Sequence, residues 1–286
     1  MNDFREIIEA ALSRQKAMND AKSLEITEAE RRELMEKDEQ ISGVMQAFQN
    51  MFGDSDEDDE IDEEDIQKFI DANPVPEWVK KHLMIGTLLN SANGEPRGIL
   101  ALTGGREDYR YSLRQNWGIN GREDALEMLA DLLKGRHSEA FDRDFAIIRE
   151  HGAKNYLSHA RNPLFDSDDI EIFEATVEGF SEILDFPPEY AQGCQTLYAW
   201  DLERIGLLAR ILAHVGYITA DEAYGWLQKA GAKAAGTFDS WQDYFVSLLL
   251  GRALHLGITE MLFAMAYDLT HDSCELLFTY PIEALK

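Results

Sequence analysis

Two oppositely charged residues, Asp201 and Arg204, stand on what should be the apolar side of a helix. Helical periodicity over residues 199–215 places them on the same side as Leu197, Leu208, Ile211 and Val215. The opposite, exposed side is then expected to carry Glu203, Arg210 and His214. Because buried charges persist only when they are paired and hydrogen-bonded, Asp201 and Arg204 need partners inside the protein.

A third charged residue, Arg252, is expected to face this pair from a neighbouring helix. The apolar side of the helix that begins after Ser240 runs through Trp241, Tyr244, Phe245, Leu248 and then Arg252. Gly251 would let another helix approach closely at this point. We therefore expect Asp201 to bridge Arg204 and Arg252, with Trp200 and Trp241 in the same cluster. The cluster either fixes the register of two helices as a buried ion-pair network or forms a pocket whose arginines bind a carboxylate or phosphate.

No other group of residues predicts chemistry, so we expect no catalytic residue, no metal ligand and no cofactor. The chain lacks a Gly-x-Ser-x-Gly motif, and neither Cys194 nor Cys274 has a recognisable catalytic setting. The seven histidines lack the His-Glu-x-x-His spacing, and His151 and His159 are too far apart for one metal-binding helix face. The segment TGGRED at residues 103–108 lacks the lysine of a phosphate-binding loop and the dinucleotide pattern. These absences favour a protein that is not an enzyme.

The run DSDEDDEIDEED, from Asp54 to Asp65, is almost wholly acidic. Its acidic residues at loop positions one, three, five and twelve resemble a calcium-binding EF-hand loop. However, Asp59 stands where the sharp turn needs glycine, and Asp65 stands where a bidentate glutamate is usual. We therefore expect a flexible acidic loop without specific calcium binding. Its candidate partner-binding residues are Asp56, Asp58, Asp59, Glu60 and Asp62.

The net charge excludes two classes of partner. With 27 Lys and Arg against 54 Asp and Glu, the formal net charge is −27, and the isoelectric point is near 4.5. Nucleic acid and anionic membranes would be repelled by such a protein, whereas basic proteins and cations would be attracted. The alternative is that the acidity only keeps the protein soluble.

The chain has the features of a cytoplasmic protein. Two distant cysteines suit a reducing compartment. The first residues, MNDFREIIEAALSRQ, lack the basic and then apolar segments of a signal peptide. The most apolar region, residues 244–267, is interrupted by Arg252, His255 and Glu260, so we expect no membrane span.

Capping patterns and 3.6-residue periodicity predict an all-α fold with one main core. Helices are expected over residues 3–21, 27–52, 66–72, 121–134, 139–151 and 168–184, and over most of the chain from residue 199 onward. Expected N-caps are Asn120, Thr219 with Glu222, and Ser240 with Asp243. One short strand is expected around Ile99 to Leu102. We predict an N-terminal helical segment with the acidic loop at residues 1–66, and a multi-helix globular domain at residues 67–286.

The C-terminal helices resemble a bacterial family known as domain of unknown function 1266. The family pattern is Trp-Asp-Leu-x-Arg, then Gly-Tyr-Ile, Ser-Trp and Gly-Arg. It corresponds here to Trp200 through Arg204, Gly216 through Ile218, Ser240 with Trp241, and Gly251 with Arg252. A Trp-Gly-Ile opening at residues 117–119 also matches, and the resemblance spans roughly residues 113–256. The family implies almost nothing about activity.

Two classes of function remain. The first is an acidic cytoplasmic protein that captures a basic protein, such as the immunity partner of a secreted antibacterial toxin. An acidic inhibitor of this kind gains fast association with its target. The second is a ligand sensor or enzyme built around Asp201, Arg204 and Arg252. The lack of catalytic motifs favours the first class.

Overall fold

The described part of the chain is built from helices alone. The computed structural model describes residues 63–257, 260–271 and 279–286, and within those residues it contains no strand. The helices are α3 (Glu63–Ala72), α4 (Glu77–Lys80), η1 (Lys81–Met84), α5 (Thr87–Ala92), α6 (Arg106–Trp117), α7 (Arg122–Leu133), α8 (Arg136–His151), η2 (Ala153–Asn155), α9 (Tyr156–His159), α10 (Ser167–Glu182), α11 (Pro188–Gly193), α12 (Ala199–His214), α13 (Ala220–Thr237), α14 (Trp241–Leu256), α15 (Glu260–His271) and η3 (Ile282–Leu285). The all-α prediction is confirmed. The described residues belong to one compact unit, Glu60–Lys286; the helices expected before residue 53 lie outside them, and the domain boundary at residue 66 stays a prediction.

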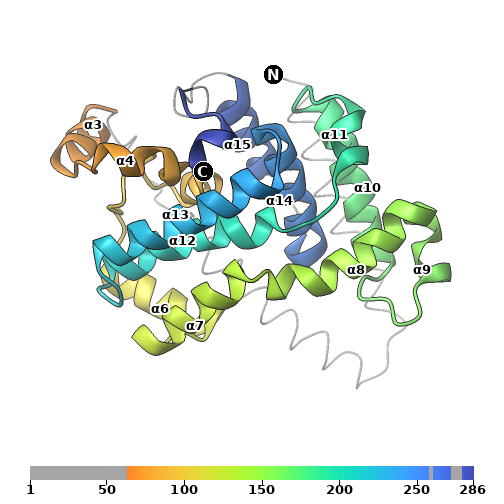
Figure 1. Ribbon diagram of the computed structural model, residues 1–286, viewed down its shortest axis with the longest axis horizontal. Helices are drawn as coiled ribbons and strands as arrows, with labels where there is room; N and C mark the ends of the chain where they lie inside the picture. The colour runs from red at the N-terminus through yellow and green to blue at the C-terminus, as the bar shows by residue number, and fades with distance from the viewer. Residues whose placement is uncertain (1–62, 258–259, 272–278) are drawn as a thin grey trace, which may run out of the picture. The chain divides into compact units, whose positions relative to one another are not determined.

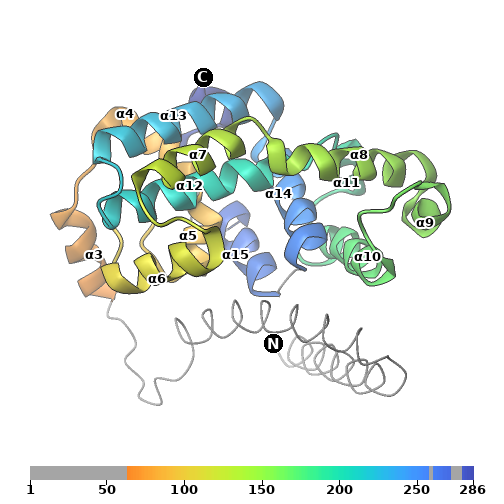
Figure 2. The ribbon, with the colours of Figure 1, turned by 90° about the horizontal axis from the view of Figure 1, so that it is seen from below.

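Helix α12 runs through the middle of this unit. The helices α5, α7, α13 and α14 pack around it, and the two ribbon views show it covered from several directions (Figures 1 and 2). Thirteen of its 16 residues are buried. The exposed side predicted for this helix is therefore wrong, because Glu203 and Arg210 are each only 1% exposed and His214 is half-buried.

The junction between η1 and α5 lies directly against α12. A Cβ atom added at Gly206 would lie 2.3 Å from the Ile85 carbonyl oxygen and 2.4 Å from the Gly86 nitrogen. Gly86 itself has φ of 86°, a left-handed conformation that disfavours other residues. Two glycines thus allow backbone-to-backbone contact between α12 and the start of α5.

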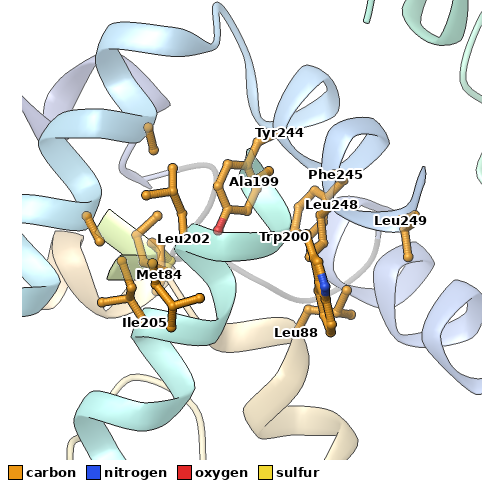
Figure 3. Packing of buried hydrophobic residues seen from close by; sticks show 14 of the residues in the cluster. Met84, Leu88, Ala199, Trp200, Leu202, Ile205, Tyr244, Phe245, Leu248 and Leu249 are labelled. Atoms are coloured by element: carbon orange, nitrogen blue, oxygen red, sulfur yellow. The ribbon is translucent and has the colours of Figure 1, made fainter. Parts of the chain in front are cut away.

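Helices α12 and α14 also approach closely, as the glycine at position 251 predicts. A Cβ atom at Gly251 would lie 2.7 Å from the Cβ of Trp200, so that prediction is confirmed. Figure 3 shows Trp200 reaching from α12 toward Phe245 and Leu248 of α14, with Leu202 on a different side of the helix. The core is therefore continuous across α12.

The N-terminal caps of α13 and α14 are those that the sequence predicts. Thr219 and Glu222 form a reciprocal capping box, and the Ser240 hydroxyl accepts a hydrogen bond from the Asp243 amide at 3.1 Å. Each cap satisfies amides that have no partner within their own helix. Local sequence alone decides where these two helices begin.

Two local predictions are wrong. Residues 99–102 form no strand; instead the Ile99 carbonyl and the Thr103 amide bind the side chains of Arg210 and Glu95. The N-cap of α7 is Gly121 rather than Asn120. The sequence patterns do not predict α5 and α6.

Candidate functional site

Asp201 binds both an arginine and the start of another helix. Its Oδ1 forms an ion pair with Arg204 within α12. Its Oδ2 accepts hydrogen bonds from the amide and the hydroxyl of Ser138, each at 3.0 Å. Ser138 is the third residue of α8, so its amide is one of the four that a helix leaves without an internal partner. The buried carboxylate therefore caps α8 as well as balancing Arg204.

Helix α8 returns this contact through Asp142. The Asp142 carboxylate accepts hydrogen bonds from the Leu197 amide and the Thr196 hydroxyl, both at 2.6 Å, just before α12 begins. Burial raises the pKa of Asp142, against the effect of these hydrogen bonds. Each of the two helices thus supplies an aspartate to the start of the other, which fixes their relative position.

Glu203 performs a similar task at the start of α5. Its carboxylate accepts hydrogen bonds from the amides of Gly86 at 2.9 Å and Leu89 at 3.2 Å. It also accepts one from the Tyr244 hydroxyl of α14 at 2.8 Å. A negative charge at a helix N-terminus interacts favourably with the helix dipole. Burial raises the pKa of Glu203, and the two amides and Tyr244 act in the opposite direction.

Arg210 binds backbone carbonyl groups at the C-terminal end of η1, just before α5. Its guanidinium donates to the carbonyl oxygens of Leu83 at 2.5 Å and Ile85 at 2.9 Å, at the end of η1. Further acceptors are the carbonyls of Gly206 at 2.7 Å and Ile99 at 3.4 Å. Burial lowers the pKa of Arg210 to about 10, and the nearby charge of Glu203 opposes that shift. The guanidinium thus satisfies carbonyls that would otherwise be buried without donors.

The sequence contains a signal that Glu203 and Arg210 are buried and bind a neighbouring backbone. The two residues are seven positions apart, and Gly206 lies between them on the same side of the helix. At this spacing the acidic residue can accept hydrogen bonds from backbone amides, the basic residue can donate to backbone carbonyls, and the glycine lets that backbone come close to the helix. The pattern of a surface helix predicts that this side faces solvent, but α12 is buried around most of its surface.

Arg252 is not bridged by Asp201, which corrects the predicted three-residue cluster. Its Nη1 donates to the Gly257 carbonyl oxygen, and its guanidinium lies 5.7 Å from the centre of the Trp200 ring. Among the described residues, no ion pair joins Arg252 to a carboxylate. Burial lowers the pKa of Arg252 to about 10. Both oxygens of Asp201 already have partners, Arg204 at Oδ1 and Ser138 at Oδ2.

Trp200 lies within the cluster, whereas Trp241 lies outside it. The Arg204 guanidinium is 4.9 Å from the Trp200 ring centre, and the indole nitrogen donates to Nδ1 of His255 at 2.9 Å. Trp241 instead donates to the Tyr280 carbonyl oxygen at 2.9 Å. It is eleven residues from Arg252 on α14, about 16 Å along a helix axis. The structure thus brings together Trp200, Asp201 and Arg204, places Arg252 at their edge and separates Trp241.

The other candidates give no further catalytic group among the described residues. Asp56, Asp58, Asp59, Glu60, Asp62 and Cys274 lie outside those residues, so the expectations about the acidic run stay predictions. Burial raises the pKa of the Cys194 thiol to about 12, which disfavours the reactive thiolate. His151 and His159 lie on different helices, α8 and α9, and do not share one helix face; their rings stack with centres 4.0 Å apart.

Neither a metal site nor a membrane span emerges from the described ranges. Within them no three His, Cys, Asp or Glu side chains are grouped so that they could hold a metal ion. None of the helices described has the length and apolar character that a membrane crossing requires.

The chain matches a family with no assigned activity. The model of the family described as "Protein of unknown function (DUF1266)" matches residues 112–281, more than half of the 286 residues. The chain therefore belongs to this family, which confirms the resemblance. No curated protein and no solved structure matches it.

Proposed function

We propose that this DUF1266 protein is a binding protein that captures a basic protein through its acidic surface. The observation that carries the proposal is the charge of α10. Four glutamates lie along one side of this helix, and no lysine or arginine occurs between Arg161 and Arg204. The glutamates are Glu171, Glu174, Glu178 and Glu182.

The α10 glutamates are arranged unfavourably for the helix itself. Glu174, Glu178 and Glu182 are spaced by four residues, and like charges at this spacing destabilise a helix. Glu178 and Glu182 also lie near the C-terminus, where the helix dipole favours basic residues, yet the last turn contains none. No ion pair joins these glutamates to a described basic residue. A basic partner would relieve both effects, which supports a role in binding.

The buried charges serve the fold, which leaves the surface charges for binding. Asp201, Glu203 and Arg210 are fully engaged with Arg204, Ser138 and backbone groups, so they hold the fold together. In its most specific form, the proposal is that the protein acts in the cytoplasm and neutralises a basic secreted toxin. Nucleic acid and anionic membranes are not proposed as partners, because the net charge of −27 would repel them.

The test compares two variants with the same change in net charge. The α10 triple variant carries Glu174→Gln, Glu178→Gln and Glu182→Gln. The paired triple variant carries Glu77→Gln, Glu107→Gln and Glu222→Gln, and its three glutamates form ion pairs with Lys80, Arg110 and Arg122. The full chain and both variants are used to capture proteins from the native host at physiological salt.

A basic protein should bind the wild type and the paired triple variant, and association with the α10 triple variant should be about three- to tenfold slower. Association with the wild type should also slow steeply as salt rises. Recovery of no partner, or of an acidic one, would contradict the proposal. Equal slowing by both variants would show that only net charge matters and that α10 is not the binding surface.

A second candidate function is the binding of a small anion at Arg252. It is favoured by the half-buried guanidinium, which has no carboxylate partner among the described residues. Inorganic phosphate should then raise the melting temperature of the wild type but not of Arg252→Met. An equal response of both proteins would remove this candidate.

A further inference from the structure

A small hollow lies between the end of α6 and α7, the helix that follows it in the chain. Its volume is about 250 Å³. Its lining combines apolar and acidic residues, namely Trp117, Gly118, Ile119, Asp124, Glu127, Met128 and Asp131. Pockets for small-molecule ligands usually measure about 300–1,000 Å³, so this hollow has the size for a single side chain rather than a whole ligand.

The apolar part of the hollow comes from the end of α6. The helix stops at Gly118, which has φ of 65°, and the Ile119 amide then bonds back to the Leu113 carbonyl at 3.0 Å. This reversal leaves Trp117 as the last helical residue, half-buried beside Met128 of α7. An indole face and a thioether are suited to the aliphatic stem of a long side chain.

The charged part comes from one side of α7. Asp124, Glu127 and Asp131 are spaced by three and four residues, which places them in a row along the helix. No lysine or arginine lines the hollow. Asp131 already binds Arg136 at 3.1 Å and Lys134 at 3.7 Å. The exposed Glu127 has no ion pair with any described residue.

Two further features make this hollow attractive to a cation. The C-terminus of α6 directs the negative end of its dipole toward the hollow. The Trp117 ring can also bind a cation over its face. Asp124 is committed to the local structure, because its carboxylate accepts a hydrogen bond from the Asn120 amide at 2.8 Å. Glu127 and Trp117 therefore remain the groups that a ligand can use.

We propose that this hollow receives one lysine or arginine side chain of the basic protein partner. The aliphatic stem packs on Trp117 and Met128, and the cation lies between Glu127 and the indole ring. This inference rests on the proposed function and names a point of attachment for its partner. The charge of α10 would accelerate the encounter, whereas the hollow would hold a single residue in place.

The test uses the full chain and three short probes. These are acetylated, amidated peptides of sequence Gly-Lys-Gly, Gly-Arg-Gly and Gly-norleucine-Gly. The chain has five tryptophans, and ¹⁵N-labelled indole groups report on each separately by NMR once Trp117→Phe has identified the Trp117 signal. The lysine and arginine peptides should shift the Trp117 signal and saturate in the millimolar range, whereas the norleucine peptide should shift it little.

Matched variants separate this site from general charge attraction. Glu127→Gln should weaken binding of the lysine and arginine peptides about fivefold. Glu178→Gln, on α10, should leave it unchanged while removing the same charge. The inference would be overturned if the Trp117 signal did not shift with the lysine and arginine peptides, or if the norleucine peptide shifted it as much. It would also be overturned if Glu127→Gln and Glu178→Gln had the same effect on peptide binding.

The outcome is distinguishable from that of the proposed function. Capture of a basic protein that depends on α10, together with peptides that leave Trp117 unmoved, would reject the hollow and retain the function. Peptide binding at Trp117 without capture of any basic protein would retain a cation-binding hollow and reject the function.

Discussion

At the scale of single residues, the buried charges of α12 act on the backbone of other elements. Asp201 and Glu203 supply acceptors to the first turns of α8 and α5, and Arg210 supplies donors to the end of η1. Each buried charge therefore satisfies groups that helix ends leave unpaired. Removing one of these side chains leaves both an unpaired backbone group and, for Asp201, an unbalanced arginine.

Replacing Asp201 with alanine should lower the free energy of unfolding by about 3–5 kcal/mol. The variant leaves Arg204, which is only 5% exposed, without its carboxylate. Urea denaturation of Asp201→Ala measures the loss, and Asp239→Ala, at an exposed position, should stay within about 0.5 kcal/mol of the wild type. A variant as stable as the wild type would show that the ion pair is not required by the fold.

His82 should make the protein sensitive to mild acid. The side chain is 2% exposed, its Nδ1 has no hydrogen-bond partner, and burial lowers its pKa from 6.5 to about 4, with a smaller effect of Lys81. Below pH 6.5 the His82 side chain takes up a proton in the unfolded chain but stays neutral in the folded protein. The contribution of His82 to the free energy of unfolding is therefore fully present above pH 6.5 and falls by about 3 kcal/mol as the pH approaches 4.

The measurement is the free energy of unfolding of the wild type and of His82→Leu between pH 7.5 and pH 4. Other acidic groups titrate in both proteins, so the difference between the two curves isolates the histidine. The wild-type curve should fall more steeply with decreasing pH. Parallel curves would mean that His82 can be protonated in the folded state.

At the scale of helices, the position of α5 depends on backbone contact with α12. Gly206→Ala should lower the free energy of unfolding by about 1–3 kcal/mol or more, because the added methyl group overlaps the Ile85–Gly86 peptide. Gly225→Ala is the matched control, since it also lies inside a helix but its Cβ would meet nothing within 4 Å. It should stabilise the protein by about 0.5–1 kcal/mol. Equal effects at the two positions, measured by thermal unfolding, would contradict the contact.

The difference between local and long-range information explains what the sequence could and could not predict. The starts of α13 and α14 follow from Thr219 with Glu222 and from Ser240 with Asp243, because each cap is contained within four residues. The pairing of Asp201 with Arg204 is equally local. The backbone partners that Glu203 and Arg210 have in η1 and at the start of α5 lie more than 100 residues away in the chain, and α5 is held partly by those contacts. The N-cap of α5, Gly86, makes no side-chain capping bond, so this short helix lacks the local start signal that α13 and α14 have.

Across the protein surface, the acidic residues fall into two groups that act differently on stability. Glu77, Glu107 and Glu222 have basic partners nearby, so their charges are balanced locally. The glutamates of α10 have none among the described residues, and their charges add to a net −27. A large net charge destabilises a compact state by self-repulsion, and salt weakens that repulsion. The free energy of unfolding should therefore rise as sodium chloride increases from about 0.01 M to 0.5 M, where the screening length is far shorter.

The two triple variants test whether α10 is a source of this repulsion. Each reduces the net charge by the same three units, so any difference between them reflects local surroundings. At low salt the α10 triple variant should be more stable than the wild type by about 1 kcal/mol, because it removes like-charge pairs and charges opposed to the helix dipole. This gain should shrink as salt rises. The paired triple variant should gain less or lose stability, because it removes attractive contacts. If both variants gained equally at low salt, the repulsion would belong to the protein as a whole and α10 would carry no special strain for a basic partner to relieve.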